Sequence, residues 1–396
     1  MHFTVEKRDS NSLARAGILK TPHGNIKTPA FVAVATKATV KSLTPEMLTE
    51  LGAQMVLGNT YHLYFEPGEG VVKAAGGLGK FMHWDGPTMT DSGGFQAFSL
   101  GAAYKKGVSK IAREMTEVRL QSDAEPALAV ITEDGVTFKS HLDGSEHLFT
   151  PERSIQIQHD IGADIIFAFD ECTSPHASDS YQREALARTH RWATRSLVQH
   201  RMLDNAQLLF GIVQGGRVQE LREESARVIG GICPLAGGFD GFGIGGSFTK
   251  DDVHTAVGWV NTLLPEDKPR HLLGIGEPED IVLAVEQGCD LFDCVTPTRN
   301  ARNGSLYTRE GKMNIGNARY RKDFFPIQQD CDCYTCNNFT KSYLAHLFRA
   351  HEMLAGTLAT IHNLRFIIHL TEELRAAILD GTLSEYKNKF LTRYKK

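Results

Sequence analysis

The chain has 396 residues, 41% of them hydrophobic, so it can bury one large core or two medium-sized ones. It has no apolar run near the roughly 20 residues that cross a bilayer and no signal peptide at its start, so we expect a cytoplasmic protein without a membrane partner. The formal net charge of -4 excludes a uniformly basic nucleic-acid-binding protein.

Short apolar runs alternate along the chain with longer segments of helical periodicity. Amphipathic stretches such as 180–201 and 279–288 separate many of these runs. A repeated strand–helix pattern implies a parallel sheet, and eight units predict an α/β fold with a closed (β/α)₈ TIM barrel. An open doubly wound sheet is the alternative. The eight predicted strands are 30–37, 54–60, 88–94, 164–171, 208–216, 241–246, 270–276 and 290–295.

Two segments depart from the regular spacing. An extended insertion at about 101–150 separates the third and fourth strands, and its end alternates apolar and polar residues around two Asp-Gly turns, which predicts a hairpin. After the eighth strand, a cysteine cluster precedes helical segments at 340–358 and 362–380. We therefore expect a catalytic barrel formed by 1–304 plus 340–396, and an inserted zinc-binding subdomain at 305–340.

The charge is distributed unevenly. Residues 296–396 contain 16 Lys and Arg against 9 Asp and Glu, which leaves 27 against 38 for the rest of the chain. A basic end on an acidic body suggests that one face binds a polyanion. An ordinary solvated helical surface would give the same count.

Polar residues follow several of the predicted strands. In a barrel, the carboxyl ends of the strands meet at one mouth, where active sites are built. A single acid at a strand end is commonly a helix cap, but several together indicate a site. The residues at these ends are Asp91, Asp170, Gln214, Gly245, Gly246 and Asp293.

These residue types suit substitution at a sugar carbon that carries a base. Of two carboxylates such as Asp293 and Asp91, one attacks the anomeric carbon and the other moves the proton of the leaving group. A further carboxylate, Asp170, can accept two parallel donors of a guanine-like base, while the Gln214 amide and a glycine N–H bind its carbonyl. Phe95 could stack on the base, although a core position explains it equally well.

Three cysteines lie within six residues in the segment CDCYTC. Closely spaced thiolates need one more ligand to complete a tetrahedral zinc site, and a site rich in thiolates is typically structural. Spacing alone leaves three downstream histidines open as the fourth ligand. The cysteines are Cys331, Cys333 and Cys336, and the histidines are His346, His351 and His362.

Two arginines, Arg299 and Arg302, follow Asp293 closely in the segment FDCVTPTRNARNG. Guanidinium groups near a nucleophile could bind the phosphates or base edges that flank a reacting nucleotide. A surface loop with ion pairs is the alternative interpretation.

The motifs LGNTYHL, TMTDSGGFQ, FAFDEC, GIVQGG, GIGEPED and FDCVTPTRNARNG, with CDCYTC and His362, resemble the bacterial tRNA-guanine transglycosylases, also called queuine tRNA-ribosyltransferases. The resemblance runs through nearly the whole chain. It implies a (β/α)₈ barrel with a zinc lobe, usually a homodimer. The implied reaction exchanges guanine at the wobble position (34) of GUN-anticodon tRNAs for 7-aminomethyl-7-deazaguanine or queuine, in queuosine synthesis. Free guanine and the free deazaguanine are then partners beside the tRNA.

The resemblance also implies roles for individual residues. Asp293 corresponds to the nucleophile of a covalent ribosyl-enzyme intermediate, and Asp91 to the general acid/base. His362 corresponds to the fourth ligand of one structural Zn²⁺. Base-binding residues are Ser92, Gly93, Gly94, Phe95, Asp170, Cys172, Gln214, Gly245 and Gly246. Segments that contact tRNA contain Gly274, Ile275, Gly276, Glu277, Pro278, Glu279, Asp280, Thr298, Arg299, Asn300, Ala301 and Arg302.

Two features depart from the bacterial pattern. The segment GGSFTKDD (245–252) puts Ser247 where Leu is typical and lacks the aligned Glu. The insertion at 101–150 is longer than usual, which suggests an additional tRNA contact or a lid. Two other classes of function remain as alternatives: a non-catalytic tRNA-binding partner subunit, against which both acids argue, and a zinc-dependent hydrolase, against which three thiolate ligands argue.

Overall fold

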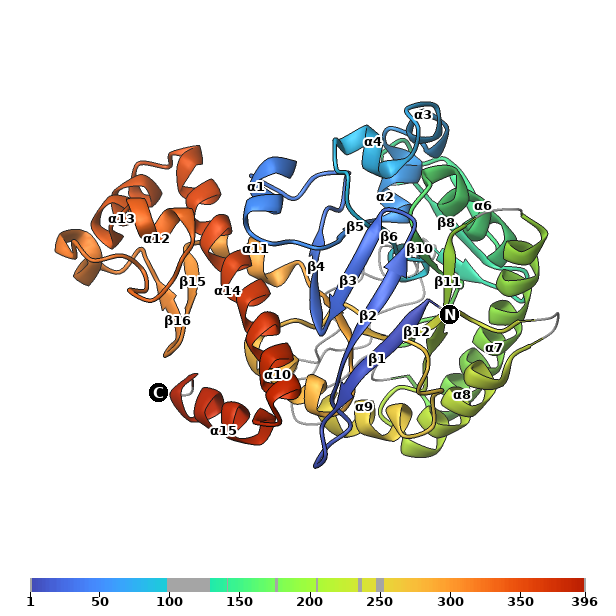
Figure 1. The fold of residues 1–396 in the computed structure, drawn as a ribbon. Coiled ribbons are helices and arrows are strands. Elements are labelled where there is room, and N and C mark those ends of the chain that lie inside the picture. Colours follow the sequence, from blue (N-terminus) through green and yellow to red (C-terminus); the bar gives the residue numbers. More distant parts are fainter. Residues whose placement is uncertain are drawn as a thin grey trace.

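The fold is taken from a computed structural model, which describes residues 2–97, 129–140, 142–174, 177–203, 206–233, 237–246 and 253–394. Its centre is a closed barrel of parallel strands (Figure 1). Each predicted strand segment contains one barrel strand, and pairing of β14 with β4 and of β6 with β10 closes the ring, so the open-sheet alternative is wrong. The barrel strands are β4 (Ala30–Val34), β5 (Val56–Gly58), β6 (Thr88–Thr90), β10 (Ile165–Phe167), β11 (Leu208–Val213), β12 (Gly241–Ile244), β13 (Arg270–Leu272) and β14 (Leu291–Asp293).

Helices follow the strands, and α1, α2, α6 and α7 begin at a residue whose side chain caps the helix. Thr150, for example, accepts a hydrogen bond from the Arg153 N–H, and Pro151 occupies the first helical position. No helix in the described part of the chain combines the length and the apolar character that a membrane span requires. These helices are α1 (Pro45–Glu50), α2 (Thr60–Phe65), α3 (Glu69–Ala74), α4 (Leu78–Met82), α6 (Pro151–Ile161), α7 (Asp179–Met202), α8 (Gln219–Gly231), α9 (Val253–Asn261), α10 (Pro278–Glu286) and α11 (Thr296–Arg302).

Successive side chains of a barrel strand point alternately into the barrel and toward the helices. In β14, Leu291 packs in the interior and Phe292 packs against the surrounding helices, so Asp293 points inward again. The same alternation from the interior residues Met89 and Ile212 places Asp91 and Gln214 at inward positions. Asp91, Gln214 and Asp293 therefore lie at the carboxyl end of the barrel, each next to an apolar residue of the barrel interior.

A three-stranded antiparallel sheet, which we did not predict, precedes the barrel. It consists of β1 (Phe3–Arg8), β2 (Arg15–Thr21) and β3 (Gly24–Thr28). Phe3, Leu19 and Ile26 of this sheet pack with residues that begin the barrel strands. The sheet therefore fills the amino-terminal end of the barrel and leaves the carboxyl end as the mouth.

The end of the predicted insertion forms β7 (Ala129–Ile131), β8 (Val136–Lys139) and β9 (Glu146–Phe149). These antiparallel strands make two successive hairpins, each turning at an Asp-Gly pair, where we predicted one. The rest of the insertion, residues 101–128, lies outside the described residues, so its role stays a prediction.

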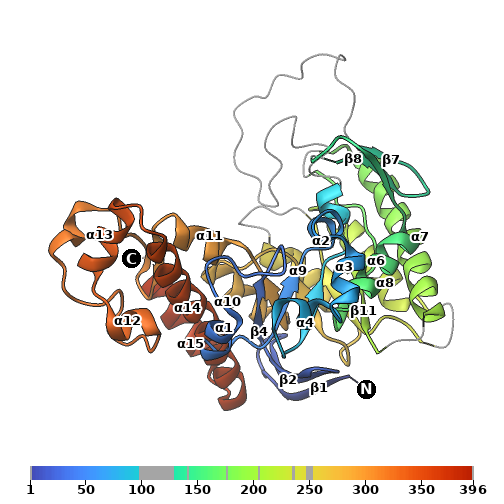
Figure 2. The ribbon, with the colours of Figure 1, turned by 90° about the horizontal axis from the view of Figure 1, so that it is seen from above.

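The remaining chain forms a smaller unit beside the barrel, and the long helix α14 runs along the interface between the two (Figures 1 and 2). We predicted two helical segments at 340–358 and 362–380. The structure has α13 within the first segment, whereas α14 begins at Met353 and so contains both the end of the first segment and the whole of the second. The division at 305–340 stays a prediction. The elements are β15 (Ser305–Thr308), β16 (Gly311–Asn314), the 3₁₀ helix η1 (Ala318–Lys322), α12 (Tyr334–Asn338), α13 (Lys341–Arg349), α14 (Met353–Asp380) and α15 (Leu383–Tyr394).

A histidine pair between α6 and α7 should make stability depend on pH. His159 Nε2 and His200 Nδ1 lie 3.0 Å apart, and burial lowers the pKa of each from 6.5 to about 4. Between these values the unfolded chain binds protons that the folded chain excludes, so stability falls as the pH falls from 6.5 toward 4. We expect a loss on the order of 2–4 kcal/mol by pH 4.5, after discounting for the partial exposure of His159.

Urea unfolding between pH 7 and 4.5 measures this effect. The double variant His159→Gln/His200→Gln should lose less stability on acidification than the wild type. The control variant His83→Gln, at an exposed site, should lose as much stability as the wild type. Equal acid sensitivity of the double variant and the wild type would contradict the assignment.

Candidate active site

A cavity of about 510 Å³ opens at the carboxyl end of the barrel. Asp91 and Asp293, 202 positions apart in the sequence, both line it. Of the other predicted site residues, it also contains Ser92, Phe95, Asp170, Cys172, Gln214, Gly245, Gly246, Gly274 and Arg299. Gly93 and Gly94 are buried beside it but do not line it. The fold therefore brings predicted site residues from the ends of six barrel strands and the loops that follow them to one mouth.

Asp91 is held by the segment that follows β5. The backbone N–H of Thr60 donates to Asp91 Oδ1 at 2.9 Å, and the Asn59 amide donates to Asp91 Oδ2. Asn59 is also the N-cap of α2, accepting from the His62 N–H. We did not assign Asn59 or Thr60 from the sequence, although both stand at the end of a predicted strand, which is the signal that could have identified them.

Asp293 ends β14 and is 14% exposed. The backbone N–H of Gly274 and the Nε2 atom of His271 each lie 2.8 Å from Asp293 Oδ1. The neighbouring Cys294 is buried, and burial raises the pKa of its thiol to about 11. Near neutral pH this sulfur is therefore a neutral thiol and a poor nucleophile.

The cavity also contains Asp170, which is 6% exposed. We call the part around Asp170 the second half of the cavity. The Ser92 hydroxyl donates to Asp170 Oδ1 at 2.9 Å, and the Gln214 amide donates to Asp170 Oδ2 at 2.7 Å. A Cβ atom on Gly245 would lie 2.7 Å from the Gln214 amide nitrogen, so glycine keeps this side open. The arrangement presents a carboxylate and an amide to a planar, hydrogen-bonding ligand.

A buried arginine lies next to the loops that carry Gln214 and Gly245, and we did not predict it from the sequence. Arg222 on α8 is 0% exposed and donates to the carbonyl oxygens of Gly216 at 2.8 Å and Gly245 at 2.6 Å. It therefore joins the loops after β11 and β12. An arginine in an amphipathic helix normally faces solvent, so nothing in the sequence indicated this position.

The predicted tRNA-contacting segments flank the cavity, and their side chains differ in exposure. Arg299 is exposed at the rim, whereas Arg302 is half-buried and donates to the Thr298 carbonyl oxygen at 2.9 Å. Burial and the nearby Arg299 charge lower the pKa of Arg302. Glu277 pairs with Lys312 of β16 at 2.8 Å. The buried members of these segments are Ile275, Gly276, Pro278, Asp280, Thr298 and Ala301, and the half-buried ones also include Glu279 and Asn300.

The predicted metal ligands gather in the smaller unit. Their ligand atoms all lie within 4.8 Å of one another, and His362 Nδ1 lies 3.7, 3.7 and 3.3 Å from the sulfurs of Cys331, Cys333 and Cys336. In a tetrahedral zinc site, bonds of about 2.3 Å to sulfur and 2.0 Å to nitrogen put these atoms about 3.5 Å apart. The four residues can therefore hold a metal ion.

The chemistry of the donor set agrees with a bound cation. His362 Nε2 lies 2.7 Å from the Tyr307 carbonyl oxygen, so this nitrogen carries the proton and Nδ1 presents its lone pair to the sulfurs. Hydrogen bonds from Cys333 and Cys336 lower the pKa of Cys331, whereas the same crowding raises the pKa of Cys336. Three thiols this close cannot all ionise without a positive charge between them.

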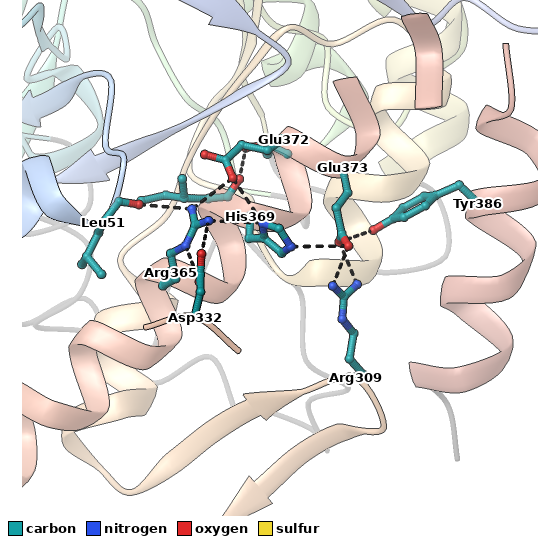
Figure 3. Close-up of polar contacts among 10 residues, drawn as sticks. Leu51, Arg309, Asp332, Arg365, His369, Glu372, Glu373 and Tyr386 are labelled. Carbon is teal, nitrogen blue, oxygen red and sulfur yellow. Dashed lines mark hydrogen bonds and ion pairs between the residues drawn. The ribbon is translucent and has the colours of Figure 1, made fainter. Parts of the chain in front are cut away.

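An ion-pair network fixes the cysteine loop to α14 (Figure 3). Arg365 donates through two nitrogens to the Asp332 carboxylate, each at 2.8 Å, and also bonds Glu372 at 3.0 Å. Asp332 stands between two of the cysteines, and α14 carries His362. The bidentate pair therefore connects the two segments that supply the ligands.

None of the four candidate ligands lines the cavity that holds Asp91 and Asp293. A metal held by these cysteines could not activate water at those carboxylates. This separation argues against the zinc-dependent hydrolase.

Comparison with known proteins supports one family. The family described as queuine tRNA-ribosyltransferase matches residues 9–396. Proteins named queuine tRNA-ribosyltransferase are similar to this chain along almost their entire length: that of Caldanaerobacter subterraneus subsp. tengcongensis is 46% identical over 395 residues, covering 99% of this chain and 97% of the relative. The relative from Pelotomaculum thermopropionicum is 45% identical, covering 99% and 98%, and that from Symbiobacterium thermophilum 46%, covering 100% and 92%.

Loss of the metal should destabilise the smaller unit. Cys336→Ser removes one sulfur ligand, and structural sites of this type bind metal with about 10 kcal/mol or more of apparent free energy. We expect the variant to lose bound metal in elemental analysis and to unfold at a lower temperature, as should the wild type treated with a chelator. Cys233→Ser, at an exposed thiol, is the matched control. Full metal content in Cys336→Ser would contradict the ligand set.

Proposed function

This chain belongs to the queuine tRNA-ribosyltransferase family and is a tRNA-guanine transglycosylase, and from that premise we propose the roles of its residues. The reaction replaces guanine at the wobble position of GUN-anticodon tRNAs by a 7-deazaguanine, either 7-aminomethyl-7-deazaguanine or queuine. The observation that carries the assignment of roles is the position of Asp91 and Asp293 in one cavity.

In the first half-reaction, a carboxylate oxygen of Asp293 attacks C1′ of the ribose. The bond from C1′ to N9 of guanine breaks, the electron pair stays on guanine, and Asp91 supplies the proton. In the second, N9–H of the incoming base gives its proton to Asp91, and N9 attacks C1′ and releases the Asp293 carboxylate. Two inversions at C1′ restore the original configuration.

The base is held in the second half of the cavity. Asp170 accepts the N1–H and the exocyclic amine, in place of the hydrogen bonds from Ser92 and Gln214. The Gln214 amide and the backbone N–H of Gly246 then donate to O6. Phe95 faces one side of the ring, and Cys172 lies close by. Residues 247–252, which depart from the bacterial pattern, lie outside the described residues.

The anticodon loop is bound outside the cavity. Arg299, exposed at the rim, is the first candidate to bind a flanking phosphate or base edge. The buried side chains of the segments 274–280 and 298–302 would act by fixing the loop that carries the exposed ones. We further propose a homodimer, in the cytoplasm where tRNA and reduced thiols occur together.

The metal is one Zn²⁺ per chain, bound by Cys331, Cys333, Cys336 and His362. Three sulfurs and one imidazole leave no open position for substrate, so its part is structural. A non-catalytic tRNA-binding subunit is not favoured, because both carboxylates are present and the relatives are named as transferases.

The nucleophile is tested by Asp293→Asn. An amide is a poor nucleophile, so this variant should form no covalent tRNA adduct on a denaturing gel and exchange no radiolabelled guanine. Asp91→Asn keeps the nucleophile and should still form the adduct, roughly 10²- to 10⁴-fold more slowly. Base exchange by Asp293→Asn at the wild-type rate would refute the mechanism.

Base recognition is tested by Asp170→Asn. The new amide presents N–H groups toward the donors of guanine, so the KM for guanine should rise roughly 10- to 100-fold in the exchange assay. Ser92→Ala leaves both carboxylate oxygens in place and should raise KM less. An unchanged KM in Asp170→Asn would remove Asp170 from the base site.

A further inference from the structure

His271 stands in the middle of β13 and is 0% exposed. Its strand neighbours Arg270 and Leu272 point toward the helices, so the imidazole points into the barrel. Its Nε2 atom lies 2.8 Å from Asp293 Oδ1. Nothing in the sequence motifs singled out this residue, and the reaction as described above does not use it.

The surroundings fix where the ring carries its proton. Nδ1 is buried and has no hydrogen-bond partner among the residues that the structure describes, and the ring lies edge-on to Phe167 with centroids 5.7 Å apart. A proton on Nδ1 would be an unsatisfied donor in an apolar environment, which is costly. The proton is therefore on Nε2, and a neutral imidazole donates it to the carboxylate.

We propose that His271 is a positioning residue for the nucleophile. It acts with the Gly274 N–H, which meets the same oxygen at 2.8 Å. Two donors from different directions fix the plane of the Asp293 carboxylate and direct its other oxygen, Oδ2, toward C1′ of the ribose. The inference rests on the proposed function, because it assumes that Asp293 is the nucleophile.

A neutral donor suits this task better than a cation. The Asp293 charge disappears when the ester to C1′ forms and returns when the second base attacks. A cationic partner would stabilise the free carboxylate and lower its reactivity, whereas a neutral N–H holds the group in both states. Lys or Arg at position 271 would place a positive charge beside Asp293 and so lower the reactivity of its carboxylate.

The competing interpretation is that His271 only fills the core beside Phe167. Two substitutions separate the interpretations, because the side-chain nitrogen of Gln reaches about as far as Nε2 of His, whereas that of Asn reaches only as far as Nδ1. His271→Gln keeps a donor near Asp293. His271→Asn is equally polar but ends short of the carboxylate.

The experiment measures single-turnover formation of the covalent tRNA adduct at saturating tRNA, with KM for tRNA and the unfolding temperature of each variant. We expect the rate constant of His271→Asn to fall roughly 10- to 100-fold with little change in KM, and His271→Gln to recover most of it. Misfolding would lower the amplitude of adduct formation and leave the rate constant unchanged.

Two results would overturn the proposal: a wild-type rate constant in His271→Asn, or equal rate constants in the Gln and Asn variants. Failure of the proposed function looks different, because the wild type would then form no adduct or Asp293→Asn would keep its activity.

Discussion

The active site depends on the register of very short parallel strands. Gly58 pairs with Thr90, so the last residues of β5 and β6 lie at one level, whereas Asp293, the last residue of β14, pairs with Val32 in the middle of β4. Because side chains alternate between the two faces, a slip of one residue in β14 would turn Asp293 toward the helices and Phe292 into the interior. Hydrogen bonding around the closed ring, which leaves no free edge, prevents such a slip.

Much of the barrel could be predicted, because each strand is a short apolar run that ends in a polar or glycine residue. The amino-terminal sheet could not, since β1 (FTVEKR) is mostly exposed and polar and gains its place only by covering the barrel. His362 illustrates the same limit. It lies 26 positions after Cys336, so spacing could not choose it, and only the resemblance did. The contact of His271 with Asp293 arises from the pairing of two neighbouring barrel strands and leaves no local signal.

The long helix α14 contacts both the candidate metal site and the segment that follows Asp293. On α14, His362 is followed by Asn363, whose amide donates to the carbonyl oxygens of Pro297 and Ser305, both at 3.0 Å. Pro297 lies between Asp293 and Arg299 in the sequence. Adjacent residues of one helix therefore hold the candidate metal site and the segment that leads from Asp293 to Arg299, so a metal bound at that site would help to keep this segment in place.

The sheet that fills the amino-terminal end of the barrel has a consequence for the order of events. With Phe3, Leu19 and Ile26 packed against the strand starts, the proposed mechanism takes both purines through the mouth at the carboxyl end of the barrel. In the proposed mechanism, guanine leaves through this mouth before its replacement can occupy the cavity. Accumulated free guanine would then compete with the deazaguanine for the same site, and the direction of exchange would depend on the relative concentrations of the two bases.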